Sequence, residues 1–308
     1  MRKIDFRAMG CSMSAILDTD TPSADSILEH VPTWFEGWEQ CFSRFRPGSE
    51  LSQLNRGQAR GWQSISTDLC RVIDTALQAA EWTGGLVVPT MLGALEQAGY
   101  TESFDRLVTS QHETSAALAP LPIHTDWHEI KLDLRQGQVF VPEGMRLDLG
   151  GIAKGWAAQH AAQTLDTTAP ALIDAGGDIA ISRARVSNAP WGIAVDDPRG
   201  GNKPLAVLSV LHGGVATSGR DYRRWQRNGA EQHHIIDPRT GQSAKTDVLT
   251  ATIVAPSAVM AEITAKAVLI LGSADGLAWI ESNQLLAALV VLDDGSVLSS
   301  SRMTQFLS

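Results

Sequence analysis

Strand-like segments follow one another between residues 169 and 219, with no helix-like segment among them. The segments at 169–182, 191–198 and 205–219 are apolar, and a turn at Gly176-Gly177 divides the first of them. Helical periodicity is found elsewhere, most clearly at 67–83 and 257–272. Because strands come in runs and helices in clusters, the pattern predicts an α+β fold of mixed or antiparallel sheets flanked by helices, not a regular alternation of strand and helix.

The remaining segments are consistent with this class. Residues 6–17 are predicted to form a strand and residues 23–42 a helix. Residues 128–151 are predicted to form three short strands, the last ending at Leu149, and an alanine-rich helix is expected from about Lys154 to Leu165. Residues 101–127 are expected to be a polar connection without regular periodicity.

Length and composition limit the organisation. The 308 residues, 44% of them hydrophobic, are enough for a single domain over 1–308, with the alternative of two intimate subdomains meeting at a cofactor cleft. The net charge is −9 and the 25 basic residues are spread along the chain, so no nucleic-acid partner is indicated.

The cysteines and the amino-terminal residues indicate the cellular compartment expected for the protein. Cys11, Cys41 and Cys70 are too few and too scattered for a disulfide framework or a zinc cluster, and are expected to be buried thiols in a reducing compartment. The first 18 residues carry no signal-peptide or lipid-anchor pattern. No apolar stretch approaches the roughly 20 residues of a membrane span. A cytoplasmic protein is therefore expected.

The segment RLDLGGIAKGWAAQ, residues 146–159, joins the predicted strand to the alanine-rich helix. Gly150 and Gly151 leave the backbone open to close approach by a ligand. Lys154 lies in the first turn of the helix, where the helix dipole disfavours a cation, and a bound anion would explain it. The alternative is an ordinary glycine turn with a solvated lysine. The spacing is that of neither a Walker loop nor a dinucleotide fingerprint.

Four further features each have an ordinary explanation when taken singly. Gly176-Gly177 reads as a tight turn, and Thr217-Ser218 as a strand end. His233 and His234 are predicted to share a strand, so alternation sends them to opposite faces. Glu262 and Lys266 are spaced for an intrahelical ion pair.

Taken together and in order, these segments resemble the ApbE family, the FAD:protein FMN transferases. The matching segments are AMGCSM, FSRFRPGSELSQLN, TGGLVVPT, LDLGGIAKGWA, LIDAGGDI, ATSGRDY, HHIIDPRTG and AEITAKAVLILG. The resemblance implies a compact α+β fold that binds FAD. It also implies a Mg²⁺-dependent transfer of FMN to a Ser or Thr hydroxyl of an acceptor flavoprotein of an electron-transfer system, with release of AMP.

The resemblance also implies which residues contact the ligands. The residues expected to bind FAD are Met9, Phe45, Val87, Val88, Asp148, Gly150, Gly151, Lys154, Thr217, Ser218, His234 and Ile236. The Gly151 carbonyl and Glu262 are expected at the metal position. His234 is the candidate for deprotonating the acceptor hydroxyl, because histidine titrates near neutral pH, and Lys266 is the second candidate catalytic residue.

The sequence departs from the family pattern at the metal position. The family's carboxyl-terminal helix presents Asp and, four residues later, Thr, where this chain has Glu262 and Lys266. A lysine has no acceptor atom and cannot ligate Mg²⁺ while protonated, but its ammonium group, paired with Glu262, could occupy the metal's place. Val88 also replaces an acidic residue. The alternatives are therefore an FAD-binding carrier or sensor that has lost the metal-dependent transfer, or an enzyme that hydrolyses FAD without an acceptor.

Overall fold

A computed structural model describes residues 1–57, 61–109, 126–201, 203–227 and 229–307. The chain divides into two compact units, each of which is described by itself. Unit 1 consists of Met1–Glu36, Lys154–Asp221 and Thr246–Ser308. Unit 2 consists of Gly37–Ala153 and Tyr222–Lys245.

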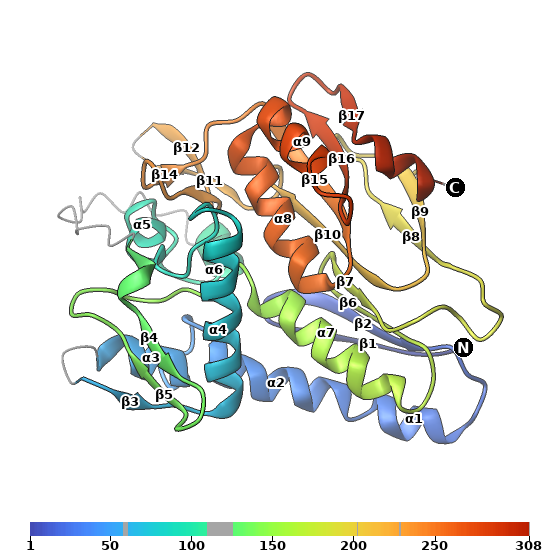
Figure 1. The fold of residues 1–308 in the computed structure, drawn as a ribbon, viewed down its shortest axis with the longest axis horizontal. Helices are drawn as coiled ribbons and strands as arrows, with labels where there is room; N and C mark the ends of the chain where they lie inside the picture. Colours follow the sequence, from blue (N-terminus) through green and yellow to red (C-terminus); the bar gives the residue numbers. More distant parts are fainter. Residues whose placement is uncertain (58–60, 110–125, 202, 228, 308) are drawn as a thin grey trace. The chain divides into compact units, whose positions relative to one another are not determined.

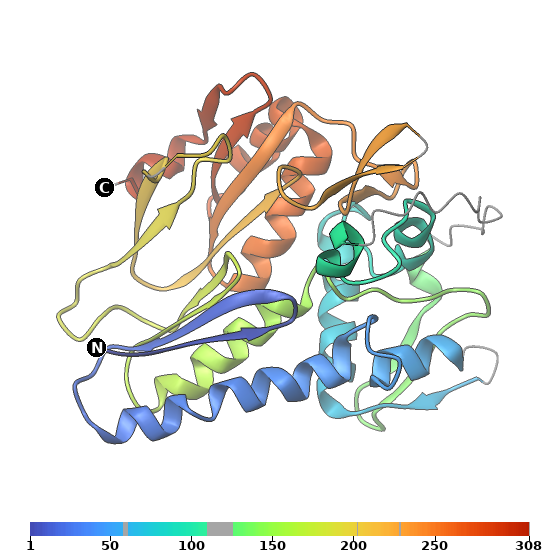
Figure 2. The ribbon, with the colours of Figure 1, turned by 180° about the vertical axis from the view of Figure 1, so that it is seen from behind.

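Unit 1 is built on an eight-stranded antiparallel sheet (Figures 1 and 2). Hydrogen-bonded neighbours across the sheet follow the order β1-β2-β6-β7-β10-β15-β16-β17. The strands are β1 (Arg2–Ala8), β2 (Cys11–Leu17), β6 (Ala171–Ala175), β7 (Asp178–Ile181), β10 (Gly213–Gly219), β15 (Val248–Ala255), β16 (Ala287–Leu292) and β17 (Val297–Ser299).

The two faces of this sheet are covered differently. Helices α7 (Ala153–Asp166) and α8 (Ala258–Leu271) lie over one face, and α9 (Ser273–Glu281) packs beside α8 (Figure 1). The hairpin of β8 (Trp191–Val195) and β9 (Ala206–Val210) packs on the other face, together with the short helix η3 (Ser301–Gln305). Alternate strand residues, among them Ile179, Val215 and Val254, fill the core under this hairpin. The strand residues between them face the helices.

Unit 2 is smaller and mainly helical. Its helices are the carboxyl-terminal half of α2 (Val31–Phe42), then α3 (Glu50–Arg56), α4 (Thr67–Trp82), α5 (Leu92–Gln97), α6 (Phe104–Thr109) and η2 (Trp127–Glu129). Its strands are β3 (Gln63–Ser64), β4 (Lys131–Asp133) and β5 (Gln138–Phe140) in one sheet, and the hairpins β11 (Arg224–Arg227) with β12 (Ala230–His233) and β13 (Ile236–Asp237) with β14 (Gln242–Ser243). The Ser66 side chain caps α4, whose apolar face, including Leu69 and Ile73, is buried.

The predicted α+β class is confirmed. Residues 67–83 and 257–272 form α4 and α8 with nearly the expected bounds, and the alanine-rich helix is α7. The single helix predicted over 23–42 is wrong, because α1 (Ser23–Leu28) ends before α2 begins. Pro32, the second residue of α2, has no N–H with which to continue the hydrogen-bond ladder of α1.

Three other local predictions are wrong. The single strand predicted over residues 6–17 is a hairpin, because β1 ends at Ala8 and the chain turns at Met9-Gly10 before β2. Residues 145–149 form no strand, because the Leu147 N–H and carbonyl bond to the Asn55 side chain (2.7 and 2.9 Å) and the Asp148 N–H bonds to the Pro89 carbonyl (2.8 Å). His234 lies in a bend after β12 and not in a strand.

The segment 101–127 is only partly described. It contains α6, which the absence of periodicity did not predict, and residues 110–125 lie outside the described residues.

Two expectations about cysteines and membranes can also be compared with the structure. All three cysteines are described and form no disulfide, but only Cys70 is buried, while Cys11 and Cys41 are half-buried. In the part of the chain that the structure describes, the longest helices are too short or too polar to cross a membrane.

The Asn55 side chain makes the hydrogen bonds that a neighbouring strand would otherwise make to Leu147. Removal of this side chain leaves the partly buried N–H and carbonyl groups of Leu147 without these bonds. Asn55→Ala is therefore expected to lower the free energy of unfolding by about 1–3 kcal/mol, measured by urea denaturation. Gln53→Ala, at an exposed position of the same helix, is the control and should change it by less than about 0.5 kcal/mol. Equal effects of the two variants would contradict this account.

Candidate functional site

Unit 1 contains four charged side chains that contact one another, termed the four-charge cluster: Lys154, Asp178, Glu262 and Lys266. The Lys266 ammonium nitrogen lies 3.0 Å from Glu262 Oε1, and that of Lys154 lies 3.8 Å from the same oxygen. Lys154 also forms an ion pair with Asp178. The side chain of Glu262 is 0% exposed, while those of the two lysines remain 16–17% exposed. The cluster therefore has a buried acidic centre and a partly accessible basic rim.

Small residues bring the elements of this cluster together. The Gly155 N–H, in the first turn of α7, donates to Glu262 Oε2 at 2.8 Å. A Cβ at position 155 would lie 2.7 Å from that oxygen and 3.1 Å from the Ala258 carbonyl, so a larger residue would displace the Glu262 carboxylate and crowd the backbone of α8. On β10, a Cβ at Gly214 would lie 2.3 Å from the Ala258 backbone, so α8 also packs closely on the sheet.

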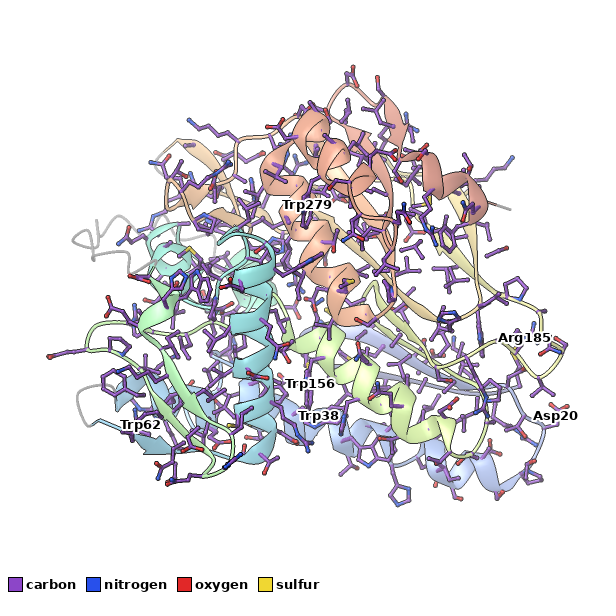
Figure 3. All side chains as sticks on the ribbon, in the orientation of Figure 1. Asp20, Trp38, Trp62, Trp156, Arg185 and Trp279 are labelled. Carbon is purple, nitrogen blue, oxygen red and sulfur yellow. The ribbon has the colours of Figure 1, made fainter. Side chains whose placement is uncertain are left out.

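Asp178 faces the helices because of the strand register. It lies opposite Ala216 in the β7–β10 pair, and directly opposed residues project to the same face of a sheet. Trp156, labelled in Figure 3, lies on the same first part of α7 as Lys154 and is itself buried at 8% exposure. The buried Trp156 side chain therefore fixes the amino-terminal end of α7, from which Lys154 contacts Asp178.

The electrostatics of Glu262 depend on the two lysines. Burial by itself would raise the pKa of this carboxyl, but the ammonium groups of Lys266 and Lys154 and the hydrogen bonds from Lys266 and Gly155 outweigh burial and hold the pKa below its usual value. Two ammonium groups and two carboxylates make the cluster charge-balanced as it stands. The buried charge of Glu262 is therefore compensated by the protein itself.

Three other expected site residues of unit 1 lie at one end of the sheet. Met9, with a φ of 48°, lies in the turn between β1 and β2. Met13 of β2 pairs with Ala175 at the end of β6, and Asp178 at the start of β7 pairs with Ala216 of β10. The β1–β2 turn and the carboxyl-terminal part of β10 are therefore at the same end of the sheet. Thr217 and Ser218 follow there but project to opposite faces.

Only one of these two hydroxyl residues shares a face with the four-charge cluster. Ser218 is buried on the helix-covered face, as Gly214 and Ala216 are. The Thr217 hydroxyl lies on the other face, 2.9 Å from that of Thr252. Contact of Thr217 with the same ligand stays a prediction.

Unit 2 brings together a second set of expected site residues around Arg44. The Arg44 Nε donates to Asp148 Oδ2 at 2.7 Å, and its Nη1 donates to the Tyr100 carbonyl at 2.8 Å. Its guanidinium carbon lies 4.0 Å from the Phe45 ring centroid and 4.6 Å from that of Tyr100. The other carboxylate oxygen of Asp148 accepts the Gly150 N–H at 3.0 Å. Arg44 thus orients both Asp148 and the aromatic rings.

The aromatic group continues from Tyr100 to Trp225 and His234. The Tyr100 ring centroid lies 5.4 Å from that of Trp225 and 6.5 Å from that of His234. Ile236 and the partly buried Val88 pack in the apolar cluster that contains Tyr100. Val87 is buried, and its N–H donates to the Thr83 hydroxyl at 3.1 Å.

His233 has a structural role. It is 5% exposed, its Nε2 lies 3.0 Å from the Ala244 carbonyl, and its Nδ1 accepts from the Ile235 N–H at 3.3 Å. These bonds assign the proton to Nε2 and leave the ring neutral. Of the two adjacent histidines, His234 is therefore the one that lies among the expected site residues.

A family model described as the ApbE family matches residues 9–290. This chain belongs to the ApbE family. It is 33% identical to the FAD:protein FMN transferase of Treponema pallidum, over 91% of this chain and 81% of that protein. It is 28% identical to the FAD:protein FMN transferase of Vibrio cholerae, over 97% and 87%. Among solved structures, the ApbE protein of Thermotoga maritima is similar with a TM-score of 0.85 at 27% identity, covering 100% of this chain and 99% of that one. The resemblance and the fold class expected from the sequence are confirmed.

The donors at the expected metal position of this ApbE protein do not fit a divalent cation. One oxygen of Glu262 accepts from Lys266 and the other from the Gly155 N–H, and Lys266 offers no acceptor atom. Within the described ranges, no cluster of three or more His, Cys, Asp or Glu side chains could hold a metal ion. Mg²⁺ prefers near-octahedral oxygen ligands, which these residues do not supply. The bonds of Glu262 therefore do not favour it as a metal ligand, and the Gly151 carbonyl at the metal position stays a prediction.

Sequence reasoning missed three residues of the candidate site in this ApbE protein. Asp178 lies in the quoted segment LIDAGGDI, and an acidic residue directly after a glycine turn was the available signal. Arg44 adjoins Phe45 in FSRFRPGSELSQLN, where a single arginine gives no periodic signal. Tyr100 has no local signal, since its position beside Phe45 depends on packing over more than 50 residues of sequence.

The charge of Glu262 makes the stability of unit 1 dependent on pH. The pKa is lowered on folding, so the stabilisation is fully present above the unfolded value of 4.5 and is lost as the pH falls through the lower folded value. Glu262→Gln leaves two ammonium groups with one carboxylate and is expected to cost about 3–5 kcal/mol at neutral pH. The difference in unfolding free energy between Glu262→Gln and the unmodified chain should become smaller at acidic pH. Denaturant unfolding across the pH range measures this difference.

Glu231→Gln is the matched control for this pH series, because Glu231 is exposed and pairs with Arg224 at 3.6 Å. Its unfolding free energy should follow that of the unmodified chain at each pH. A Glu262→Gln deficit that stays constant from neutral to acidic pH would contradict the assigned role of the carboxylate charge.

Arg44→Lys keeps the charge but loses the planar fork that reaches Asp148 and the Tyr100 carbonyl together. The expected cost is about 1.5–3 kcal/mol of unfolding free energy, the contribution of a hydrogen bond to a charged group. Arg183→Lys, at an exposed ion pair with Asp166, is the control and should be near neutral. Equal unfolding midpoints for the two variants would argue against Arg44 as an organising residue.

Proposed function

We propose that this chain transfers the FMN portion of FAD to a Ser or Thr hydroxyl of an acceptor protein. The observation that carries the proposal is the match over residues 9–290 to a family whose relatives are named FAD:protein FMN transferase. The acceptor is proposed to be a flavoprotein of an electron-transfer system. Location in the cytoplasm stays a prediction.

The chemistry is a phosphoryl-group exchange without oxidation or reduction. The acceptor oxygen forms a bond to the phosphorus on the FMN side of FAD. The bond from that phosphorus to the bridging oxygen breaks, and the bridging oxygen leaves with AMP. The hydroxyl proton passes to a base, for which we propose His234. Balance requires only FAD and the hydroxyl as reactants, with flavinylated protein, AMP and a proton as products.

Residues of each unit have properties suited to parts of FAD. In unit 1, the side chains of Lys154 and Lys266 are 16–17% exposed, and ammonium groups bind phosphate oxygens well. In unit 2, the exposed Phe45 ring offers aromatic surface for a flavin or adenine ring, and the buried Tyr100 ring packs against it. The Arg44 Nη2 is buried and has no hydrogen-bond partner among the described residues, which is consistent with a missing ligand or water acceptor.

A second function is favoured by one observation. Because the donors around Glu262 do not fit a divalent cation, the chain is also a candidate FAD carrier or sensor without transfer activity. This alternative predicts that FAD is retained and little AMP is formed. Hydrolysis of FAD without an acceptor would instead give AMP and free FMN.

Incubation with FAD and an acceptor protein of the Vibrio cholerae relative distinguishes these functions. Transfer predicts that the acceptor gains the mass of FMN less water, with one AMP released per modification, measured by intact-protein mass spectrometry and AMP chromatography. The Vibrio cholerae relative serves as the positive control. An unmodified acceptor beside a modified positive control, both with and without Mg²⁺, would contradict the proposal.

The role of His234 is tested in the same assay. His234→Gln is expected to slow transfer about 10²- to 10⁴-fold, the range for loss of a general base, while FAD affinity changes little. His233→Gln should act differently, through lower stability, because His233 bonds to the Ala244 carbonyl. Transfer by His234→Gln at the unmodified rate would remove His234 from the proposed chemistry.

A further inference from the structure

The four-charge cluster already contains the positive charge that a bound metal would supply. We infer that the Lys266 ammonium group is a built-in cation of this ApbE protein, so that the FAD diphosphate binds here without a divalent metal ion. This inference rests on the proposed function, because it takes FAD as the ligand of the site. It differs from the proposed function in that it concerns the source of the cation and not the fate of FMN.

The first argument is the occupancy of the Glu262 carboxylate. Both oxygens already accept bonds, from Lys266 at 3.0 Å and from the Gly155 N–H at 2.8 Å. An ionised carboxylate has about four lone-pair sites, so these two bonds do not by themselves exclude a metal ion. A magnesium ion about 2.0–2.1 Å from Oε1 would, however, lie beside the Lys266 ammonium group that bonds to the same oxygen, and the two cations would repel each other.

The second argument is the charge balance. Lys154 and Lys266 together offset Glu262 and Asp178. A divalent ion on Glu262 would add two positive charges near two ammonium groups that already share one carboxylate oxygen. An incoming diphosphate has the opposite effect, because its negative charge meets the two ammonium groups. Because Glu262 and Asp178 are buried and the two lysine side chains are partly exposed, an incoming anion reaches the lysines before it meets the carboxylates.

The third argument is the geometry of Lys266 itself. An ordinary exposed ion pair at this helical spacing contributes little. This pair differs, because its carboxylate is fully buried while 17% of the lysine side chain remains exposed. One of the three ammonium N–H donors is directed at Glu262. An ammonium group has three donors, so Lys266 can bond to a phosphate oxygen as well as to Glu262.

The closing experiment measures binding of FAD by flavin fluorescence and binding of Mn²⁺ by electron paramagnetic resonance, on the full chain. FAD affinity in EDTA and in Mg²⁺ is expected to agree within about twofold. Mn²⁺ added without FAD should remain unbound. FAD affinity that falls about tenfold or more in EDTA and returns with Mg²⁺, or Mn²⁺ that binds to the unmodified chain and is lost in Glu262→Gln, would overturn the inference.

Variants identify the group responsible. Lys266→Thr combined with Glu262→Asp replaces the ammonium group with oxygen ligands, so FAD binding should become at least about tenfold dependent on Mg²⁺. Lys203→Thr makes the same lysine replacement at an exposed position of unit 1 and should behave as the unmodified chain. Thermal melting checks the fold of each variant. If the double variant does not fold, Lys266→Arg, which retains the cation, must keep FAD binding insensitive to EDTA.

The outcomes separate the inference from the proposed function. Chelator-insensitive FAD binding without FMN transfer would support the inference and contradict the transferase proposal. Mg²⁺-dependent FAD binding with transfer would do the reverse. The absence of FAD binding under all conditions would overturn both.

Discussion

Glu262 keeps its negative charge in a fully buried position because two ammonium groups and a backbone N–H surround it. This arrangement depends on close packing that only small residues allow, since Gly155 lets α7 reach the carboxylate and Gly214 lets α8 lie against the sheet. A buried ion of this kind is costly unless each partner is present. The organisation of unit 1 around its candidate site therefore follows from the compensation of one carboxylate.

Arg44 has the corresponding organising role in unit 2. Its planar guanidinium group donates to Asp148 and to the Tyr100 carbonyl while lying over two aromatic rings, a combination that lysine cannot reproduce. Asp148 in turn fixes the backbone that leads to Gly150. A charged residue without local periodicity thus positions a loop and a hydrophobic surface at the same time.

Membership of the ApbE family and the donor set around Glu262 bear on function in different ways. The family match supports FMN transfer from FAD as the reaction. The ion pair between Glu262 and Lys266 concerns a different question, namely whether a lysine or a metal ion supplies the positive charge for a bound diphosphate. A lysine in this role would replace a metal ion that can dissociate with a cation that is part of the chain. It would supply one positive charge in place of two, and it would orient fewer oxygen atoms.

By itself the sequence determined the α+β class, the bounds of the long helices and the family, because apolar periodicity and ordered motifs are local along the chain. It also indicated that Glu262 and Lys266 would pair on one turn of helix. Only the tertiary structure decided that Asp178 joins Lys154, that Ser218 and not Thr217 lies on the helix-covered face of the sheet, and that Arg44 meets Tyr100. It also replaced the strand expected at 145–149 by bonds to the Asn55 side chain. These features depend on strand register and on packing between residues distant in sequence, neither of which leaves a periodic signal.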